Sequence, residues 1–159
     1  YEISLGSNPV VAGALVMAFQ IIGIAGSMTL PLLIRGARGT RWWPGLLPVG
    51  TLIALVGMAL WPAAMLAWLC IGGLAGGGSL TMAMTLMAQR ARTTEHSTAL
   101  SGMAQSLGYL IAAAGPVAFG ALLGASGGWI APFALIWCVA VAQIALGLSV
   151  GRPRFVLER

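Results

Sequence analysis

Uncharged hydrogen-bonding side chains occur inside otherwise apolar stretches of this 159-residue sequence. Gln105 and Tyr109 are four residues apart, so a helix would place both on one face. An amide inside such a stretch is costly unless it is hydrogen-bonded, so it should face other helices or a wet cavity. A solute site is one interpretation, and a hydrogen bond between helices with no solute is the other. The residues that we expect to bind a solute are Gln20, Thr81, Thr85, Gln105, Ser106 and Tyr109.

The two threonines have a simpler alternative. Thr81, Thr85 and Gln89 are spaced four residues apart, which places them on one helical face. A threonine hydroxyl in a helix can donate to the carbonyl four residues earlier, and this bond alone would satisfy it. Gln143 has no polar neighbour of this kind in the sequence, so we expect it to be structural.

Residues that would support covalent or ion-coupled chemistry are missing from the apolar stretches. The sequence has no Asp, and its acidic residues are Glu2, Glu95 and Glu158. His96 is the only histidine, and beside Glu95 we expect it in a solvated loop. A serine nucleophile needs a base, and a buried proton relay needs an ionisable side chain. The sequence therefore predicts no catalytic site, no metal site, no cofactor and no enzyme activity.

The composition indicates which solvent surrounds the chain. Hydrophobic residues make up 59%, charged residues make up 7%, and the mean hydropathy is +0.96. Soluble domains carry about 25% charged residues because their surfaces face water. These values exclude an ordinary soluble enzyme, a disordered tail and a nucleic-acid binder. We therefore expect the lipid bilayer to be a partner and nucleic acid not to be one.

Five stretches are long and apolar enough to cross a bilayer, whose ~30 Å hydrocarbon core requires roughly 20 helical residues. In lipid, every backbone polar group must be paired within its own segment, so each stretch should be a helix. The expected fold is an all-α membrane protein. The expected spans cover residues 9–34, 44–61, 65–89, 98–123 and 129–150.

All eight basic residues are arginines, and they lie only at alternate ends of the expected spans. An excess of arginine in short loops marks the cytoplasmic side. We therefore expect a multi-pass protein of the cytoplasmic (inner) membrane of a bacterium, with its carboxyl terminus in the cytoplasm. The alternative is that these arginines bind anionic lipid or solute. They are Arg35, Arg38, Arg41, Arg90, Arg92, Arg152, Arg154 and Arg159.

Small residues form ridges in the third and fourth spans. Such ridges let a neighbouring backbone approach closely, and the alternative is a flexible helix that faces a cavity, because glycine weakens a helix by up to ~1 kcal/mol. Pro116 removes a backbone hydrogen bond, so we expect it to kink or loosen its helix as a gating bend. The residues expected to serve packing or gating are Gly72, Gly73, Gly76, Gly77, Gly78, Gly108, Gly115 and Pro116.

The same residues resemble a known family. The motif Leu-Ser-Gly-Met-Ala-Gln-Ser-Leu-Gly-Tyr-Leu at 100–110, Ala-Ala-Ala-Gly-Pro at 112–116 and Gly128-Trp129 are similar to the carboxyl half of major facilitator superfamily transporters. Within that superfamily the chain most resembles the cyanate and nitroimidazole transporter (CynX/NimT) family. The resemblance implies the eighth to twelfth helices of a twelve-helix bundle. The preceding helix and the amino-terminal half would then lie outside this sequence, which we expect to be a fragment.

The resemblance also implies a function. Two six-helix halves would rock about a site near the bilayer midplane and move a small organic or inorganic solute, anions included. The first, third and fourth spans would line the central cavity, while the second and fifth would be peripheral. The missing amino-terminal half would be a partner of this chain. The alternatives are a drug or metabolite efflux protein of the same superfamily, and a non-transporting membrane scaffold.

Overall fold

The computed structural model confirms an all-helical protein. It describes residues 3, 6, 8–36, 41–90 and 93–151, with residues 35 and 36 placed by their backbone. Arg38, Arg92, Arg152, Arg154 and Arg159 lie outside the described residues. Over these ranges the structure contains five helices long and apolar enough to cross a membrane. They are α1 (Pro9–Gly36), α2 (Trp43–Leu60), α3 (Met65–Arg90), α4 (Thr94–Ser126) and α5 (Ile130–Val150), and a short 3-10 helix, η2 (Pro62–Ala64), joins α2 to α3.

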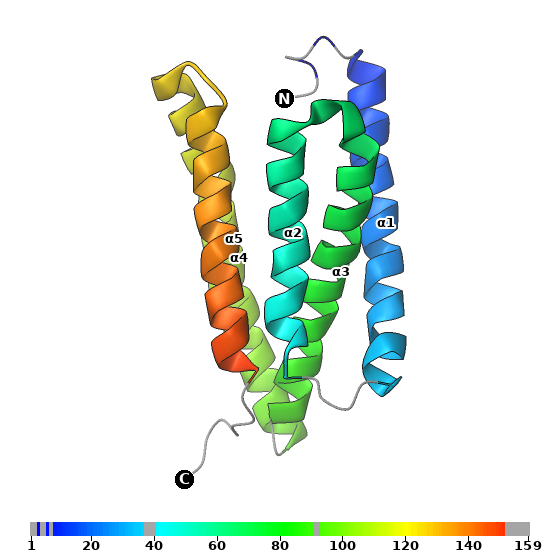
Figure 1. The fold of residues 1–159 in the computed structure, drawn as a ribbon. Helices are drawn as coiled ribbons and strands as arrows, with labels where there is room; N and C mark the ends of the chain where they lie inside the picture. The colour runs from blue at the N-terminus through cyan, green and yellow to red at the C-terminus, as the bar shows by residue number, and fades with distance from the viewer. Residues whose placement is uncertain (1–2, 4–5, 7, 37–40, 91–92, 152–159) are drawn as a thin grey trace.

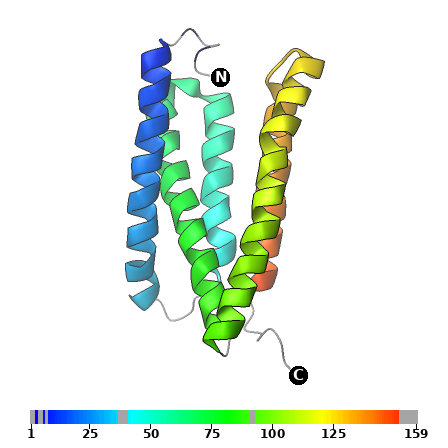
Figure 2. The ribbon, with the colours of Figure 1, turned by 180° about the vertical axis from the view of Figure 1, so that it is seen from behind.

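The helices run up and down side by side (Figures 1 and 2). Helices α1, α3 and α5 run in one direction, and α2 and α4 run in the other. Arg41, Arg90 and the start of α4 therefore lie at one end of the bundle, which we call the arginine end. Trp61 and Trp129 lie at the opposite end.

Helix α3 lies between α1 and α2 and packs on both. The α1–α3 contact is backbone against backbone: a Cβ atom added to Gly26 would lie 2.7 Å from the Leu74 Cα atom, and one added to Gly77 would overlap the Gly23 carbonyl. On the α2 side, a Cβ atom on Gly72 would lie 3.1 Å from that of Ala54. Glycine is needed here because, in lipid, dispersion between closely approaching backbones takes the place of the hydrophobic drive.

Helix α5 packs on α2 at the arginine end through contacts that local sequence patterns did not indicate. A side chain on Gly147 would overlap the Pro44 carbonyl, and one on Gly45 would overlap the Leu148 side chain. The Arg90 guanidinium, in the last turn of α3, donates a hydrogen bond to the carbonyl of Val150 at the end of α5. A cation there also suits the negative ends of both helix dipoles.

Helix α4 is longer than the span expected at 98–123, and this corrects one prediction. His96 and Glu95 are exposed, as expected, but they lie in the first turn of α4 and not in a loop. The Thr93 hydroxyl oxygen accepts the His96 backbone N–H at 3.2 Å and caps the helix, while Glu95 suits the positive end of the helix dipole. At the other end Gly127 adopts a φ of 64° and ends the helix.

Candidate functional site

A cavity of about 290 Å³ lies between α1 and α3 and contains the first of the expected solute-binding residues, Gln20. Its wall on α3 is largely glycine, so backbone atoms line it. Two of its side chains are polar, those of Gln20 and Ser27, and the Ser27 hydroxyl already donates to the Ile24 carbonyl at 2.7 Å. The Gln20 amide is therefore the group best placed to bind a molecule in this cavity. The lining residues are Phe19, Gln20, Gly23, Ile24, Ser27, Gly73, Gly76, Gly77 and Leu80.

The glycines of α3 divide between the two roles that the sequence left open. Gly72, Gly73, Gly77 and Gly78 contact atoms of α1 or α2 closely enough that a Cβ atom at each would lie within 3.1 Å of a neighbour. Gly76 has no such neighbour within 4 Å and faces the cavity. Four of these glycines therefore pack closely on a neighbouring helix and Gly76 does not, while Gly73 and Gly77 line the cavity together with Gly76.

The two threonines of α3 donate to backbone carbonyls. Thr85 bonds the Thr81 carbonyl at 2.8 Å, which is the local bond that its spacing allows. Thr81 donates both to the Gly77 carbonyl at 3.3 Å and, across the helix interface, to the Ser27 carbonyl at 3.2 Å. Their hydroxyl protons are thus engaged, and only the oxygen lone pairs could accept a hydrogen bond from a solute.

Replacing Thr81 by valine is expected to weaken folding rather than solute binding. Valine keeps the shape of the side chain but removes the hydrogen bond between α1 and α3, so the free energy of unfolding should fall by roughly 0.5–1.5 kcal/mol. Equilibrium unfolding in mixed detergent micelles would measure this loss. Thr85→Val removes only a local bond and should cost less. A large fall in solute affinity for Thr81→Val with unchanged stability would contradict this expectation.

Helix α4 meets α3 near the arginine end through the second expected amide. The Gln105 Nε2 atom donates to the Met84 sulfur at 4.0 Å. Met84, Leu80, Gly77 and Gly73 follow one another at helical spacing along a single face of α3, so Gln105 lies below the Gln20 cavity on the same side. At 1.5 Å per residue, the levels of Gly73 and Met84 differ by about 16 Å. Gln20 and Gln105 therefore share a wall but do not form one compact cluster.

Ser106 and Tyr109 complete the polar side of α4. Both are exposed, and 72% of the Tyr109 surface is accessible, so this side chain does not pack on α3. Within the described ranges, no group of three His, Cys, Asp or Glu side chains could hold a metal ion. The chemistry available on this wall is hydrogen bonding by neutral amides and hydroxyls.

Known proteins are similar in sequence to most of this chain. The chain is 30% identical over 152 residues to the 2-nitroimidazole transporter of Escherichia coli, and 31% identical over 157 residues to the uncharacterized transporter YycB of Bacillus subtilis. It is 33% identical over 115 residues to a Thauera aromatica protein described as a candidate anionic 4-hydroxy-benzoate permease, of which it covers 68%. The chain belongs to the cyanate and nitroimidazole transporter family of the major facilitator superfamily.

The match covers unequal shares of the proteins. The matches to the Escherichia coli and Bacillus subtilis proteins cover 96% and 98% of this chain, respectively. Each covers only 39% of the relative's own length. No protein-family model and no solved structure matches the chain significantly. These relatives are named as transporters or permeases. Like a multi-pass membrane protein, the described part of this chain has five helices long and apolar enough to cross a membrane.

In this family member the structure brings to one cavity two polar residues that no local sequence pattern linked. Gln143 of α5 and Ser79 of α3 line a second cavity of about 190 Å³, between α2, α3 and α5. The Ser79 hydroxyl donates to the Ala75 carbonyl at 2.8 Å. Because the two residues are 64 positions apart (143 minus 79), no local spacing could have brought them together.

The small-residue face of α4 is open. A Cβ atom at Gly108 or Gly115 would meet nothing within 4 Å, and α4 contains no buried residue. The helix continues through Pro116 to Ser126. The gating role expected for Pro116 and these glycines remains a proposal for the complete transporter.

Proposed function

We propose that this chain forms helices eight to twelve of a twelve-helix secondary transporter that moves a small solute across the bacterial inner membrane by alternating access. Five helices of twelve agree with the 39% share of the longer relatives that the chain covers. The amino-terminal half and the seventh helix would supply the opposite wall of the site. Any charged residue that couples transport to an ion would also come from there.

The observation that carries this proposal is the Gln20 cavity. Polar side chains in a membrane protein face the bundle interior or a water-filled path, so Gln20, Gln105, Ser106 and Tyr109 would face the translocation pathway. The α3 wall of the cavity is glycine backbone, which leaves room for a flat molecule against the helix. The names of two relatives specify small ring compounds, 2-nitroimidazole and 4-hydroxy-benzoate. We propose a planar, hydrogen-bonding solute of that size, with aromatic anions as the first class to examine.

Reconstitution of the complete transporter tests this function. Proteoliposomes preloaded with unlabelled 4-hydroxybenzoate or 2-nitroimidazole should accumulate the labelled compound by exchange. Solute movement into right-side-out versus inside-out membrane vesicles would then distinguish uptake from efflux. Absence of exchange for a panel of small planar solutes, with correctly folded protein, would favour the scaffold alternative.

The proposed orientation predicts which residues a membrane-impermeant thiol reagent reaches. In a protein whose Cys70 and Cys138 are replaced by alanine, Ser126→Cys should react in intact cells. Arg41→Cys should react only after the membrane is opened, because the arginine end would be cytoplasmic. Both native side chains are exposed, so each site offers an accessible thiol. The reverse pattern of labelling would invert the topology.

A further inference from the structure

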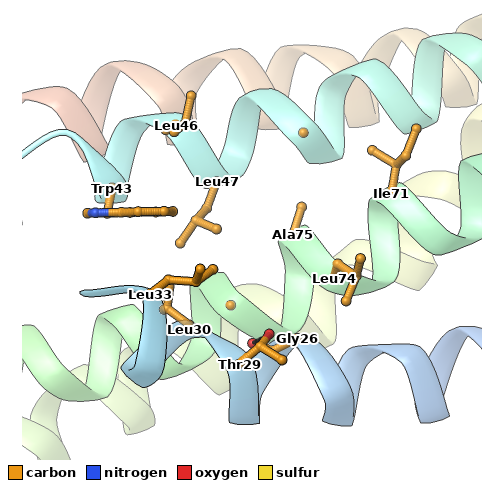
Figure 3. Close-up of a pocket in the computed structure, with 12 residues that line it drawn as sticks. Gly26, Thr29, Leu30, Leu33, Trp43, Leu46, Leu47, Ile71, Leu74 and Ala75 are labelled. Carbon is orange, nitrogen blue, oxygen red and sulfur yellow. Dashed lines mark hydrogen bonds between the residues drawn. The ribbon is translucent and has the colours of Figure 1, made fainter. Parts of the chain in front are cut away.

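A further cavity lies on the side of α3 that faces away from the Gln20 cavity. Helices α1 and α2 both pack on α3 and leave an apolar cavity of about 350 Å³ between them, which we call the α1–α2 groove. Figure 3 shows Trp43 and Leu47 of α2 on one side of the groove and Leu30 and Leu33 of α1 on the other, with the α3 residues Leu74 and Ala75 beside them. Thr29 also lines the groove, and its hydroxyl donates to the Gly26 carbonyl at 3.2 Å. The groove therefore offers hydrocarbon to whatever occupies it.

The groove and the Gln20 cavity lie on opposite faces of α3. The groove is lined by α3 residues 71, 74, 75 and 78, and the Gln20 cavity by 73, 76, 77 and 80. At 3.6 residues per turn these two sets are centred about half a turn apart. If the polar face is turned to the interior, the apolar groove is turned to the lipid.

The arginine end of the groove is cationic. Trp43 lines the groove, and Arg41 lies two residues earlier with its guanidinium 5.3 Å from the centre of the Trp42 ring. The segment 35–41 contains three arginines and no acidic residue. Neither the groove nor a larger apolar cavity of about 430 Å³, lined by Leu15, Leu55 and Met65 among others, has a basic residue in its lining, but Arg41 is a near neighbour of the groove residue Trp43. Of these two apolar cavities, the groove is the one that combines hydrocarbon walls with a neighbouring cation.

We infer that the α1–α2 groove binds an acyl chain of an anionic phospholipid, whose phosphate is held by Arg41 beside the Trp42 and Trp43 rings. Lipid is the apolar molecule that surrounds a membrane helix, and an acyl chain matches the hydrocarbon walls. Arginine near the surface attracts anionic lipid, and tryptophan prefers the headgroup level. The site is separate from the proposed solute pathway and does not depend on the identity of the solute.

Photolabelling of the complete protein in membranes tests the acyl-chain part of this inference. The probe is phosphatidylglycerol with a diazirine in its acyl chain, and labelled peptides are identified by mass spectrometry. We expect labelling within residues 26–33 and 43–50, reduced by excess unlabelled phosphatidylglycerol. No labelling of either segment would show that another part of the complete protein or a second copy covers the groove, and would overturn the inference.

Matched variants extend the test. Leu33 lines the groove and is 56% exposed, whereas Leu32 is 66% exposed and lines none of the cavities described above. Leu33→Trp should fill the groove and lower labelling there roughly tenfold, and Leu32→Trp should leave it unchanged. Equal labelling of the two variants would contradict binding in the groove.

A separate measurement tests whether Arg41 binds the lipid phosphate. Arg41→Gln should reduce the preference for phosphatidylglycerol over phosphatidylcholine about fivefold in native mass spectrometry of the detergent-solubilised protein. Arg41→Lys keeps the charge and should retain most of this preference. An unchanged preference in Arg41→Gln would show that Arg41 does not bind the lipid phosphate.

Discussion

Replacing Gly77 by alanine is expected to destabilise the bundle strongly. The added Cβ atom would overlap the Gly23 carbonyl oxygen and lie 2.7 Å from its carbonyl carbon, and backbone atoms cannot rotate away. Helices α1 and α3 would have to separate along the contact that holds them together. Overpacking of this kind costs typically 1–3 kcal/mol, so we expect the free energy of unfolding to fall by roughly that amount. Equilibrium unfolding of the purified protein in mixed micelles would measure it.

The neighbouring glycine is the matched control. Gly76 is one residue away on the same helix and has no atom within 4 Å of its Cβ position. Gly76→Ala brings the same gain in helix propensity, at most about 1 kcal/mol, without the overlap. The variant should therefore be as stable as the original protein or slightly more stable. Equal stabilities for Gly77→Ala and Gly76→Ala would show that the close approach of α1 does not exist in the complete protein.

Replacing Gln20 by leucine is expected to have the largest effect on transport. Leucine has a similar size and a good helix propensity, so the bundle should fold. A solute bound in the cavity would lose the Gln20 amide, and one unpaired polar group in a dry site costs about 1–3 kcal/mol. The apparent affinity should fall roughly tenfold to a hundredfold. Counterflow in proteoliposomes, read as KM against maximal rate, would measure the change.

Substitutions of two further glutamines test whether the loss of affinity is specific to the α1–α3 face. Gln143→Leu removes the same group from the second cavity, on the α5 side of α3, and should leave the KM unchanged. Gln105→Ala should lower uptake without loss of folded protein if its amide also contacts the solute. A similar fall in affinity for Gln20→Leu and Gln143→Leu would refute the assignment of the solute pathway to the α1–α3 face.

Much of the fold could be predicted because its signals are local. Apolar runs of about 20 residues predict spanning helices, and the short arginine-free connections predict antiparallel neighbours. Polar residues isolated in these runs, such as Gln20 and Gln105, could be selected as candidates because an amide in lipid needs a reason to be there. The end of a helix is a weaker signal, because a single cap bond decides it. This is why the prediction placed His96 in a loop when Thr93 caps the helix ahead of it.

The sequence by itself determined the solvent, the number of helices long enough to span a membrane and a short set of polar candidates, since each depends on composition or near-neighbour spacing. The family followed from the resemblance of motifs such as residues 100–110 to known transporters. Tertiary structure alone decided which face of α3 meets which helix. Gly76 and Gly77 have the same chemistry, adjacent positions and a place in the lining of the Gln20 cavity, yet only Gly77 also touches the backbone of α1. One residue of helix turns a Cβ direction by about 100°, so its role depends on where the neighbouring helices lie. The cavity that Ser79 and Gln143 both line and the α1–α2 groove have the same origin, because both arise only where distant segments pack together.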